Sequence, residues 1–380
     1  MAINSIPRAE QVGSLKRAPR LIAANEAIYA PGHVAIEAAE RERGRGLDEL
    51  YAIAAEETRR VVQRQLDLGL DVVSDGEFRR YMFLNSFFDG ITGFSSEVSK
   101  AKFKAQDGSV IEWNMQYVVD RLKQVDSPAQ REAAFMSSVT DHLYKVTFPA
   151  ASFLALPYNY KPEINGHAYG SLRELIEHVV AIEKSMIADA VAAGCRYVQL
   201  DFPVYPFLCD PDWRARMERH GYSWQETLEL ATWADREVIS GLPPHVRTAM
   251  HVCRGNNQGR YVAEGPLDAV AEALFSLPYD SFLIEWEDKA RMGDYSALRH
   301  VPKGDSVVVL GIVSSKVATM ETQDALLSEL DRASKHIDPA RLAISPQCGF
   351  ASTLKGNLVT EDDQWQKLAL VAQTARRYWK

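Results

Sequence analysis

The chain has 380 residues, of which 46% are hydrophobic and 25% are charged, a composition typical of globular proteins. Its 43 Lys and Arg against 51 Asp and Glu give a formal net charge of −8, which argues against a nucleic-acid-binding surface, because such surfaces are basic. The opening residues, MAINSIPRAEQ, lack the apolar core of a signal peptide, and no stretch approaches the roughly 18 uncharged apolar residues of a membrane span. We therefore expect a cytoplasmic protein that binds neither nucleic acid nor membrane; whether it forms a homo-oligomer is left open.

Eight short apolar runs are predicted to be β-strands. In chain order they are Gln11–Ser14, Asp71–Ser74, Tyr144–Phe148, Arg196–Leu200, Val246–His251, Phe282–Glu285, Ser306–Leu310 and Leu342–Ser345. Most of these runs are continuously apolar rather than alternating. That pattern is typical of parallel strands that are covered on both faces.

Amphipathic patterns between these runs predict helices over 47–68, 172–193, 224–240, 266–277, 321–335 and 361–378. The first of them is followed by Gly69, a common residue just beyond a helix C-terminus. The second and third begin after Ser171 and Ser223, each with a glutamate three residues later, and this spacing predicts capping boxes.

The alternation of eight strands with helices predicts one α/β domain over residues 1–380, a (β/α)8 TIM barrel. The alternative is a doubly wound open sheet, but no G-x-G-x-x-G follows the first strand. Long insertions follow the second strand, over 78–142, and the fourth strand, over about 202–222. The first insertion is predicted to be a loop or hairpin subdomain, with a turn at Asp107-Gly108, and both belong to the face that carries barrel active sites.

Potential metal ligands follow three of the predicted strands. His251 and Cys253 are two residues apart at the end of the fifth strand, so their side chains point the same way. Glu285 ends the sixth strand and Cys348 follows the eighth. Each of these residues alone is more often structural, but imidazole, two thiolates and a carboxylate converging at the mouth of a barrel favour tetrahedral zinc.

Such a ligand set predicts a way to activate sulfur. A catalytic zinc keeps one exchangeable position, and the carboxylate of Glu285 is the ligand that competes least well with a thiol. An incoming thiol is therefore expected to displace Glu285, lose its proton and become a nucleophile. The predicted reaction is the transfer of an alkyl group to the sulfur of a small thiol.

The motifs along the chain resemble one known family, the cobalamin-independent methionine synthases, and specifically their catalytic C-terminal barrel in its short, single-barrel form. The similar stretches cover most of the chain: Gln11–Leu15 (QVGSL), Asp71–Arg79 (DVVSDGEFR), Val198–Pro203 (VQLDFP), His251–Asn256 (HVCRGN), Ile284–Glu287 (IEWE), Leu310–Lys316 (LGIVSSK) and Ser345–Thr353 (SPQCGFAST). The resemblance implies a zinc methyltransferase whose metal ligands are His251, Cys253, Glu285 and Cys348. It also implies that Glu77 and Asp201 bind the ammonium of an amino-acid thiol such as homocysteine and that Ser14 contacts the same molecule.

The chain departs from that family in ways that leave the substrates open. The second, N-terminal barrel of full-length synthases has no counterpart in these residues, Phe202 stands where an acidic residue is usual, and 313–316 lacks the histidine proposed as general acid. The chain is also similar to zinc enzymes that join coenzyme M to epoxyalkanes. A sulfonate acceptor of that kind needs cations, and the candidates are Lys16, Arg17, Arg254 and Lys316.

Two further alternatives are a barrel whose zinc is purely structural and a metal-free decarboxylase of the uroporphyrinogen type. The acceptor thiol, the alkyl donor and the general acid are not assigned by the sequence.

Overall fold

The computed structural model describes residues 6–29, 46–95, 99–104, 108–287 and 292–380. At its centre is a six-stranded sheet, in which each strand pairs in parallel with the strand that follows it along the chain. The strands are β5 (Val146–Pro149), β6 (Tyr197–Asp201), β7 (Arg247–Val252), β8 (Ser281–Glu285), β9 (Val307–Val313) and β10 (Leu342–Pro346). Six of the eight predicted strands are therefore confirmed to within a few residues, and the fold is mixed α/β with a parallel sheet.

Neither of the first two predicted strands forms a strand. The second, Asp71–Ser74, holds a single bridge, and the bridge near the first, Gln11–Ser14, lies two residues before it, at Ala9. Ala9 pairs in parallel with Ile344 of β10, and Val73 pairs in parallel with Tyr144, just before β5. Between the two segments the Asp71 N–H donates to the Ala9 carbonyl at 2.9 Å. The Asp71 carboxylate accepts from the N–H groups of Arg8 and Ala9, so a side chain takes the place of the ladder hydrogen bonds of a longer strand.

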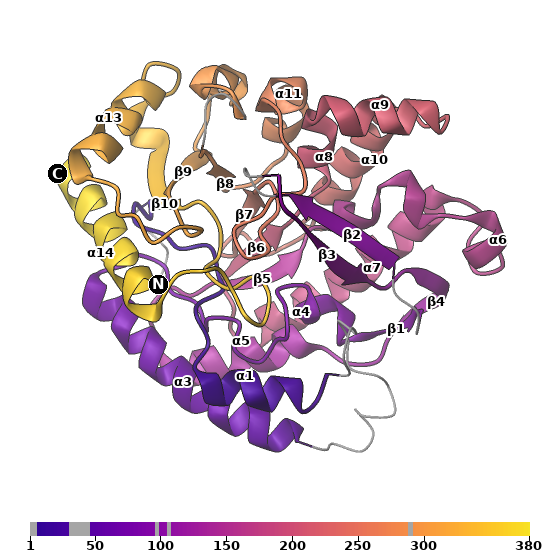
Figure 1. The fold of residues 1–380 in the computed structure, drawn as a ribbon, viewed down its shortest axis with the longest axis horizontal. Helices are drawn as coiled ribbons and strands as arrows, with labels where there is room; N and C mark the ends of the chain where they lie inside the picture. Colours follow the sequence, from indigo (N-terminus) through magenta and orange to yellow (C-terminus); the bar gives the residue numbers. More distant parts are fainter. Residues whose placement is uncertain (1–5, 30–45, 96–98, 105–107, 288–291) are drawn as a thin grey trace.

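Helices surround the sheet (Figure 1). Seven of the described helices pack side by side in the order α3, α14, α13, α11, α10, α7 and α5. The contact between α13 and α11 runs through a 3-10 helix. Their bounds are α3 (Leu47–Leu68), α5 (Pro128–Val139), α7 (Leu172–Ala192), α10 (Trp224–Glu237), α11 (Ala271–Phe275), α13 (Gln323–Ala333) and α14 (Glu361–Tyr378). The shorter elements are α1 (Pro19–Glu26), α4 (Asn85–Phe88), α6 (Pro162–Asn165), α8 (Tyr205–Cys209), α9 (Pro211–Arg219), η1 (Ala151–Leu154), η2 (Pro157–Asn159), η3 (Leu267–Ala269), η4 (Tyr295–His300) and η5 (Pro339–Arg341).

The helix ends show how local sequence sets these bounds. Gly69 adopts φ 78°, the left-handed conformation in which glycine commonly ends a helix, so α3 stops where the sequence predicted. Ser171 and Ser223 each accept the N–H of the glutamate three residues on, which is one of the two hydrogen bonds of each predicted capping box. The predicted helix 266–277 is instead η3 followed by α11, because Val270 between them has φ −124° and interrupts the helical path.

The first insertion contains two antiparallel strand pairs. β1 (Ile91–Phe94) pairs with β4 (Val118–Gln124), and β2 (Ser99–Lys104) pairs with β3 (Val110–Met115). The hairpin predicted within this insertion is confirmed, although Asp107 of its turn lies outside the described residues. In Figure 1 β2 and β3 lie across the middle of the view, apart from the six-stranded sheet.

The hydrophobic core has two parts. The larger part fills the space between the sheet and the helices. A smaller cluster lies on the opposite face of the strands and consists of Val12, Val72, Tyr197, Ala249, Leu283, Val307, Val309 and Ala343. Two residues beyond members of this small cluster, on the same face of their strands, come His251 and Glu285. The interior of the sheet thus changes from apolar to ionisable side chains toward the carboxyl ends of the strands.

No described helix combines the length and the apolarity of a membrane span.

Candidate metal centre

Three of the four predicted metal ligands meet at the carboxyl end of the sheet. The sulfurs of Cys253 and Cys348 and a ring nitrogen of His251 all lie within 4.8 Å of one another, and all three residues are buried. His251 lies in β7, Cys253 directly follows that strand, and Cys348 follows β10. Parallel strands bring these distant parts of the chain together, because their carboxyl ends share one edge. All four cysteines are free thiols, as expected of a chain without a disulfide framework.

The imidazole of His251 is oriented for metal binding. Its Nδ1 is 3.1 Å from the backbone carbonyl of Leu283, which accepts a hydrogen bond from that nitrogen. Its Nε2 is buried without a hydrogen-bond partner. A histidine that donates one ring N–H to a carbonyl and leaves the other nitrogen free is the arrangement found at metal-bound histidines, so the donor set fits a metal ion.

The two sulfurs differ in acidity. The Cys253 thiol donates to the sulfur of Cys348, which lowers the pKa of Cys348 well below its usual value, and nearby His251 and Lys316 act in the same direction. The same contact with Cys348, together with burial, raises the pKa of Cys253. A thiolate in this pair is therefore stabilised by the thiol of its neighbour and by the cationic groups around it.

The fourth predicted ligand, Glu285, does not join this group. Its Oε1 is 2.5 Å from Nζ of Lys316, and its Oε2 accepts the backbone N–H of Arg254 at 2.9 Å. The side chain of Glu285 is fully buried and that of Lys316 is 3% exposed. Both carboxylate oxygens thus have cationic or N–H partners from the protein, although Glu285 lies close enough for its charge to raise the pKa values of His251 and Cys253.

The metal-ligating group opens into a cavity of about 1190 Å³. The predicted substrate residues Ser14, Glu77 and Asp201 line this cavity together with His251 and both cysteines. The insertions supply part of the remaining wall: Phe103 comes from β2, and Phe202, Phe207 and Trp213 come from the segment after β6.

Two buried carboxylates face the cavity without a cation that neutralises both. Burial raises the pKa of Asp201 to about 7, and the charge of Glu77 contributes to that rise. Burial also raises the pKa of Glu77, whose Oε1 accepts from Thr147 at 2.9 Å and whose Oε2 is buried without a hydrogen-bond partner. Carboxylates held in this way favour a cationic ligand, since a positive charge would repay their desolvation.

Backbone strain coincides with the cavity wall. Glu77 and Phe202 both line it, and both have φ of 58°, a left-handed conformation that residues other than glycine rarely adopt. Strained positions of this kind concentrate at functional sites, where the surrounding structure holds them in place.

The predicted cations lie elsewhere. Lys16 donates to the carbonyls of Asn357 at 2.7 Å and Lys355 at 3.2 Å, and Lys316 pairs with Glu285. Arg254 donates to the Gly265 carbonyl at 3.0 Å. None of these three cations is among the described residues that line the cavity.

The sequence alone did not single out several supporting residues. Gln199 donates to Asp201 at 2.7 Å and bonds to Lys145, which in turn pairs with Glu10 at 2.8 Å. The signal for Gln199 was present, because it lies two residues before Asp201 and therefore on the same face of β6. Asn256 donates to the Gly349 carbonyl at 2.8 Å and so ties the segment after Cys253 to the segment that carries Cys348.

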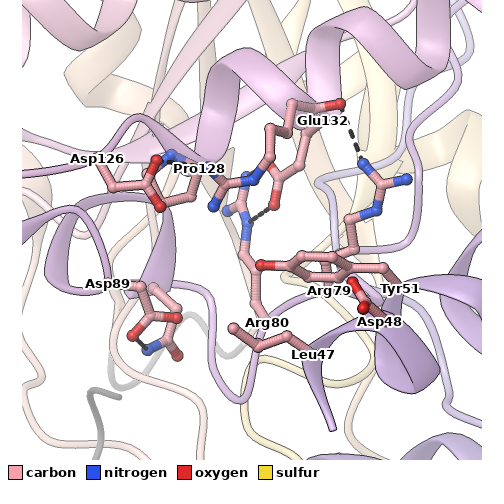
Figure 2. A pocket seen from close by; sticks show the side chains of 11 residues that line it. Leu47, Asp48, Tyr51, Arg79, Arg80, Asp89, Asp126, Pro128 and Glu132 are labelled. Atoms are coloured by element: carbon pink, nitrogen blue, oxygen red, sulfur yellow. Dashed lines mark hydrogen bonds and ion pairs between the residues drawn. The ribbon is translucent and has the colours of Figure 1, made fainter. Parts of the chain in front are cut away.

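A second, smaller cavity of about 330 Å³ lies among α3, α4 and α5 (Figure 2). Its charged groups largely pair with one another: Arg80 with Glu132, and Arg131 with Asp126. The guanidinium carbon of Arg79 lies 5.6 Å from the centroid of the Tyr51 ring. The pair of Arg80 with Glu132 is buried and that of Arg131 with Asp126 is partly exposed, and Arg80 links this cavity to the main one by donating to Thr147 at 2.8 Å.

Several known proteins are similar to this chain in sequence. No protein-family model matches the chain. The uncharacterised protein YxjG of Bacillus subtilis is 31% identical over 98% of this chain and 95% of its own length, and YxjH of the same organism is 28% identical over 98% and 95%. A methionine synthase of Sulfurisphaera tokodaii is 23% identical over 74% of this chain and 71% of its own length.

Solved structures extend the likeness to the whole fold. A candidate vitamin-B12-independent methionine synthase from Listeria monocytogenes matches with a TM-score of 0.71 and 25% identity over 99% of both chains. A B12-independent methionine synthase from Shewanella sp. W3-18-1, in complex with selenomethionine, matches with a TM-score of 0.71 and 18% identity over 98% of both chains. From the 31% identity to YxjG over nearly the whole chain, and from these synthases among its relatives and structural neighbours, the chain belongs to the methionine-synthase-like family.

Proposed function

We propose that the chain is a zinc-dependent thiol S-alkyltransferase that transfers a methyl group to homocysteine or a closely similar amino-acid thiol. The relatives support methyl transfer to a thiol at the level of the family. The observation that carries the proposal for this chain is the unpartnered Nε2 of His251, gathered with two cysteine sulfurs in the wall of a cavity that also holds two buried carboxylates.

His251, Cys253 and Cys348 would hold the metal ion. Imidazole and thiolates are the ligands that zinc prefers, and three protein ligands leave a position for a substrate. Zinc in such a site supplies Lewis acidity, which lowers the pKa of a thiol that shares the site. The Leu283 carbonyl fixes the orientation of the imidazole.

Glu77 and Asp201 would bind the ammonium group of the acceptor. Their raised pKa values reflect burial, which for Glu77 outweighs the attraction of Arg80 at 3.9 Å, and a bound ammonium would favour the ionised form of both. Ser14 lines the same part of the cavity and is the proposed contact to the rest of the amino-acid group.

The transfer itself would be a displacement at carbon. The sulfur, having released its proton, forms a bond to the methyl carbon, and the bond from that carbon to the donor breaks with its electron pair on the leaving atom, which takes up a proton. The aromatic wall of Phe202, Phe207 and Trp213 leaves room for the donor beside the acceptor in a cavity of about 1190 Å³. The donor is a small alkyl compound.

An amino-acid thiol is favoured over coenzyme M because of the charges near the ligands. A sulfonate needs cations beside the metal ligands, whereas Lys316 pairs with Glu285 and Lys16 binds backbone carbonyls. The cations that do line the cavity come from β2, the start of α6 and α9 rather than from the strand ends that carry the ligands: Lys102, Lys161, Arg216 and Arg219. Arg17 is likewise committed to backbone carbonyls, including those of Glu77 and Ala351.

We also propose that the whole chain is one domain whose sheet closes into a (β/α)8 barrel. The support is that the segments around Ala9 and Val73 pair with opposite edges of the six-stranded sheet and are joined to each other by a backbone hydrogen bond. The continuous series of packed helices outside the sheet agrees with this closure.

Calorimetry of the zinc-loaded protein with homocysteine, cysteine, coenzyme M and glutathione tests the proposed acceptor. Homocysteine should bind most tightly, and Glu77→Gln should weaken its binding about 10- to 100-fold, because a hydrogen bond to a charged group contributes about 1.5–3 kcal/mol. The same substitution should leave the weaker binding of coenzyme M almost unchanged. Equal effects on both thiols would contradict an amino-acid acceptor.

X-ray absorption spectroscopy separates this function from a purely structural zinc. Added homocysteine should replace an oxygen scatterer by a sulfur, whereas a closed structural site would not change. Full activity after chelation of the metal would favour the metal-free decarboxylase alternative.

Gly13→Ala provides a steric test of the role of Glu77. A Cβ at Gly13 would lie 2.6 Å from Oε1 of Glu77 and 3.1 Å from Cγ2 of Thr147, so the carboxylate would have to move. Overpacking of this kind costs about 1–3 kcal/mol, and we expect homocysteine affinity to fall by about 10-fold or more while zinc content is retained. Gly170→Ala is the matched control, because its Cβ would meet only the Glu174 carboxylate, at 3.2 Å. Unchanged affinity in Gly13→Ala would argue against Glu77 as an acceptor contact.

A further inference from the structure

A buried series of hydrogen bonds leads across the interior of the sheet to Asp201. Tyr197, Gln199 and Asp201 alternate along β6, so their side chains lie on one face of that strand. Nζ of Lys145, a residue just before β5, pairs with Oε2 of Glu10 at 2.8 Å and donates to Oε1 of Gln199 at 2.8 Å. The side chains of Lys145 and Glu10 are fully buried, and Gln199 and Asp201 are buried as well.

The amide of Gln199 can point only one way in this series. An ammonium donates hydrogen bonds but accepts none, so the amide oxygen of Gln199 has to face Lys145. The amide nitrogen therefore faces the other way, and it donates to the Val12 carbonyl and to Oδ1 of Asp201, both at 2.7 Å. Lys145 thus determines that Asp201 meets a hydrogen-bond donor, which holds its carboxylate in the wall of the main cavity.

Glu10 in turn holds the ammonium of Lys145. The carboxylate oxygen that pairs with Lys145 also accepts from the Tyr197 hydroxyl at 3.0 Å. Nζ of Lys145 lies 5.0 Å from the centroid of the Tyr197 ring. A buried ion pair contributes little stability compared with well-packed apolar side chains, so its presence is better explained by the polar groups that it orients.

We propose that Lys145 is a positioning residue for the amino-acid acceptor, because through the amide of Gln199 it fixes the carboxylate of Asp201 in the direction that receives the ammonium group. This inference rests on the proposed function, in which Asp201 contacts that ammonium. Lys145 is fully buried and is not among the described residues that line the cavity, so it acts only through its neighbours. Without the lysine, the amide is free to turn and to present its oxygen to Asp201, and two acceptors repel each other.

Two ligands separate the positioning of Asp201 from damage to the whole site. Homocysteine carries the ammonium, and 4-mercaptobutyrate is homocysteine without its amino group. Lys145→Met alone would leave Glu10 as a buried unpaired charge, so the variant tested is Lys145→Met/Glu10→Leu, which removes both charges. In calorimetry of the zinc-loaded protein we expect homocysteine affinity to fall by about 10-fold, because a hydrogen bond to a charged group is lost. Zinc content and the affinity for 4-mercaptobutyrate should not change.

Gln199→Met is a second measurement that leaves the ion pair in place. Methionine has nearly the length of glutamine but lacks the amide donor and acceptor. This variant should lower homocysteine affinity by a similar factor of about 10 and should again spare 4-mercaptobutyrate. Adding Lys145→Met/Glu10→Leu to Gln199→Met should lower the affinity no further, because all of these changes act through the same amide.

A different pattern would overturn the inference. Equal losses for both thiols would make Lys145 a purely structural residue, and additive losses in the combined variant would mean that it does not act through Gln199. Full preference for homocysteine in Gln199→Met would also overturn it, whether or not Lys145→Met/Glu10→Leu folds. If Asp201→Asn kept that preference, or if the wild type lacked it, the proposed acceptor contact would fail together with this inference. A preference lost in Asp201→Asn but kept in Lys145→Met/Glu10→Leu would overturn the inference alone.

Discussion

Cys348→Ser should lose nearly all bound zinc. The sulfur of Cys348 lies within 4.8 Å of the sulfur of Cys253 and of a ring nitrogen of His251. Removing one of three protein ligands leaves two, and we expect zinc affinity to fall by at least about a thousandfold, which corresponds to about 4 kcal/mol. The measurement is metal content by mass spectrometry after dialysis, together with chelator competition, and homocysteine binding should disappear with the metal.

Cys195→Ser is the matched control. Cys195 is also a buried free thiol, but its sulfur donates to the Tyr197 carbonyl at 3.2 Å and is not part of the metal-ligating group. This variant should keep stoichiometric zinc. If Cys348→Ser also kept stoichiometric zinc, the assignment of the metal centre would be wrong.

Arg80→Met should cost about 3–5 kcal/mol of unfolding free energy, because it leaves the buried carboxylate of Glu132 without its partner. Arg80 and Glu132 have side chains that are 2% and 3% exposed, and Nε and Nη2 of the arginine contact the two carboxylate oxygens. The remaining nitrogen donates to Thr147 at 2.8 Å, and Thr147 in turn donates to Glu77 at 2.9 Å. The loss should therefore appear both in urea denaturation and as weaker binding of homocysteine to the zinc-loaded protein.

Arg60→Met tests whether burial of the ion pair is the cause of the loss of unfolding free energy expected for Arg80→Met. Arg60 pairs with Glu57 and Glu361, but its side chain is 44% exposed, and exposed pairs contribute about 0–1 kcal/mol. A loss below about 1 kcal/mol in both variants would show that the buried network around Arg80 is not needed for stability. Adding Glu132→Leu to Arg80→Met should restore part of the stability, since it removes the unpaired charge.

Much of the fold follows from local sequence. Six of the predicted strands and the ends of α3 agree with the structure, because continuous apolar runs and a left-handed Gly69 act over a few residues. The positions of His251 and Cys253 also follow from sequence, since the alternation of side chains along a strand places residues two apart on one face. The hairpin of β2 and β3 follows from short-range turn signals in the same way.

Other features depended on contacts between distant parts of the chain. The segments around Ala9 and Val73 are single bridges because the Asp71 side chain accepts hydrogen bonds that a longer ladder would have used. Lys16, expected to meet a substrate, instead binds carbonyls more than 300 residues away along the chain. A charged residue's partner cannot be read from its own neighbours in sequence.

The amino-acid sequence by itself determined which ligand types end the strands and that the carboxyl ends of parallel strands bring them together. Only the tertiary structure decided which of these side chains face one another. Glu285 pairs with the ammonium of Lys316, 31 residues further on, whereas His251 and the two cysteines bring their ligand atoms within 4.8 Å of one another. The physical reason is that periodicity fixes the direction of a side chain along one strand, whereas a buried charge takes whichever opposite charge the packing of neighbouring strands places within reach.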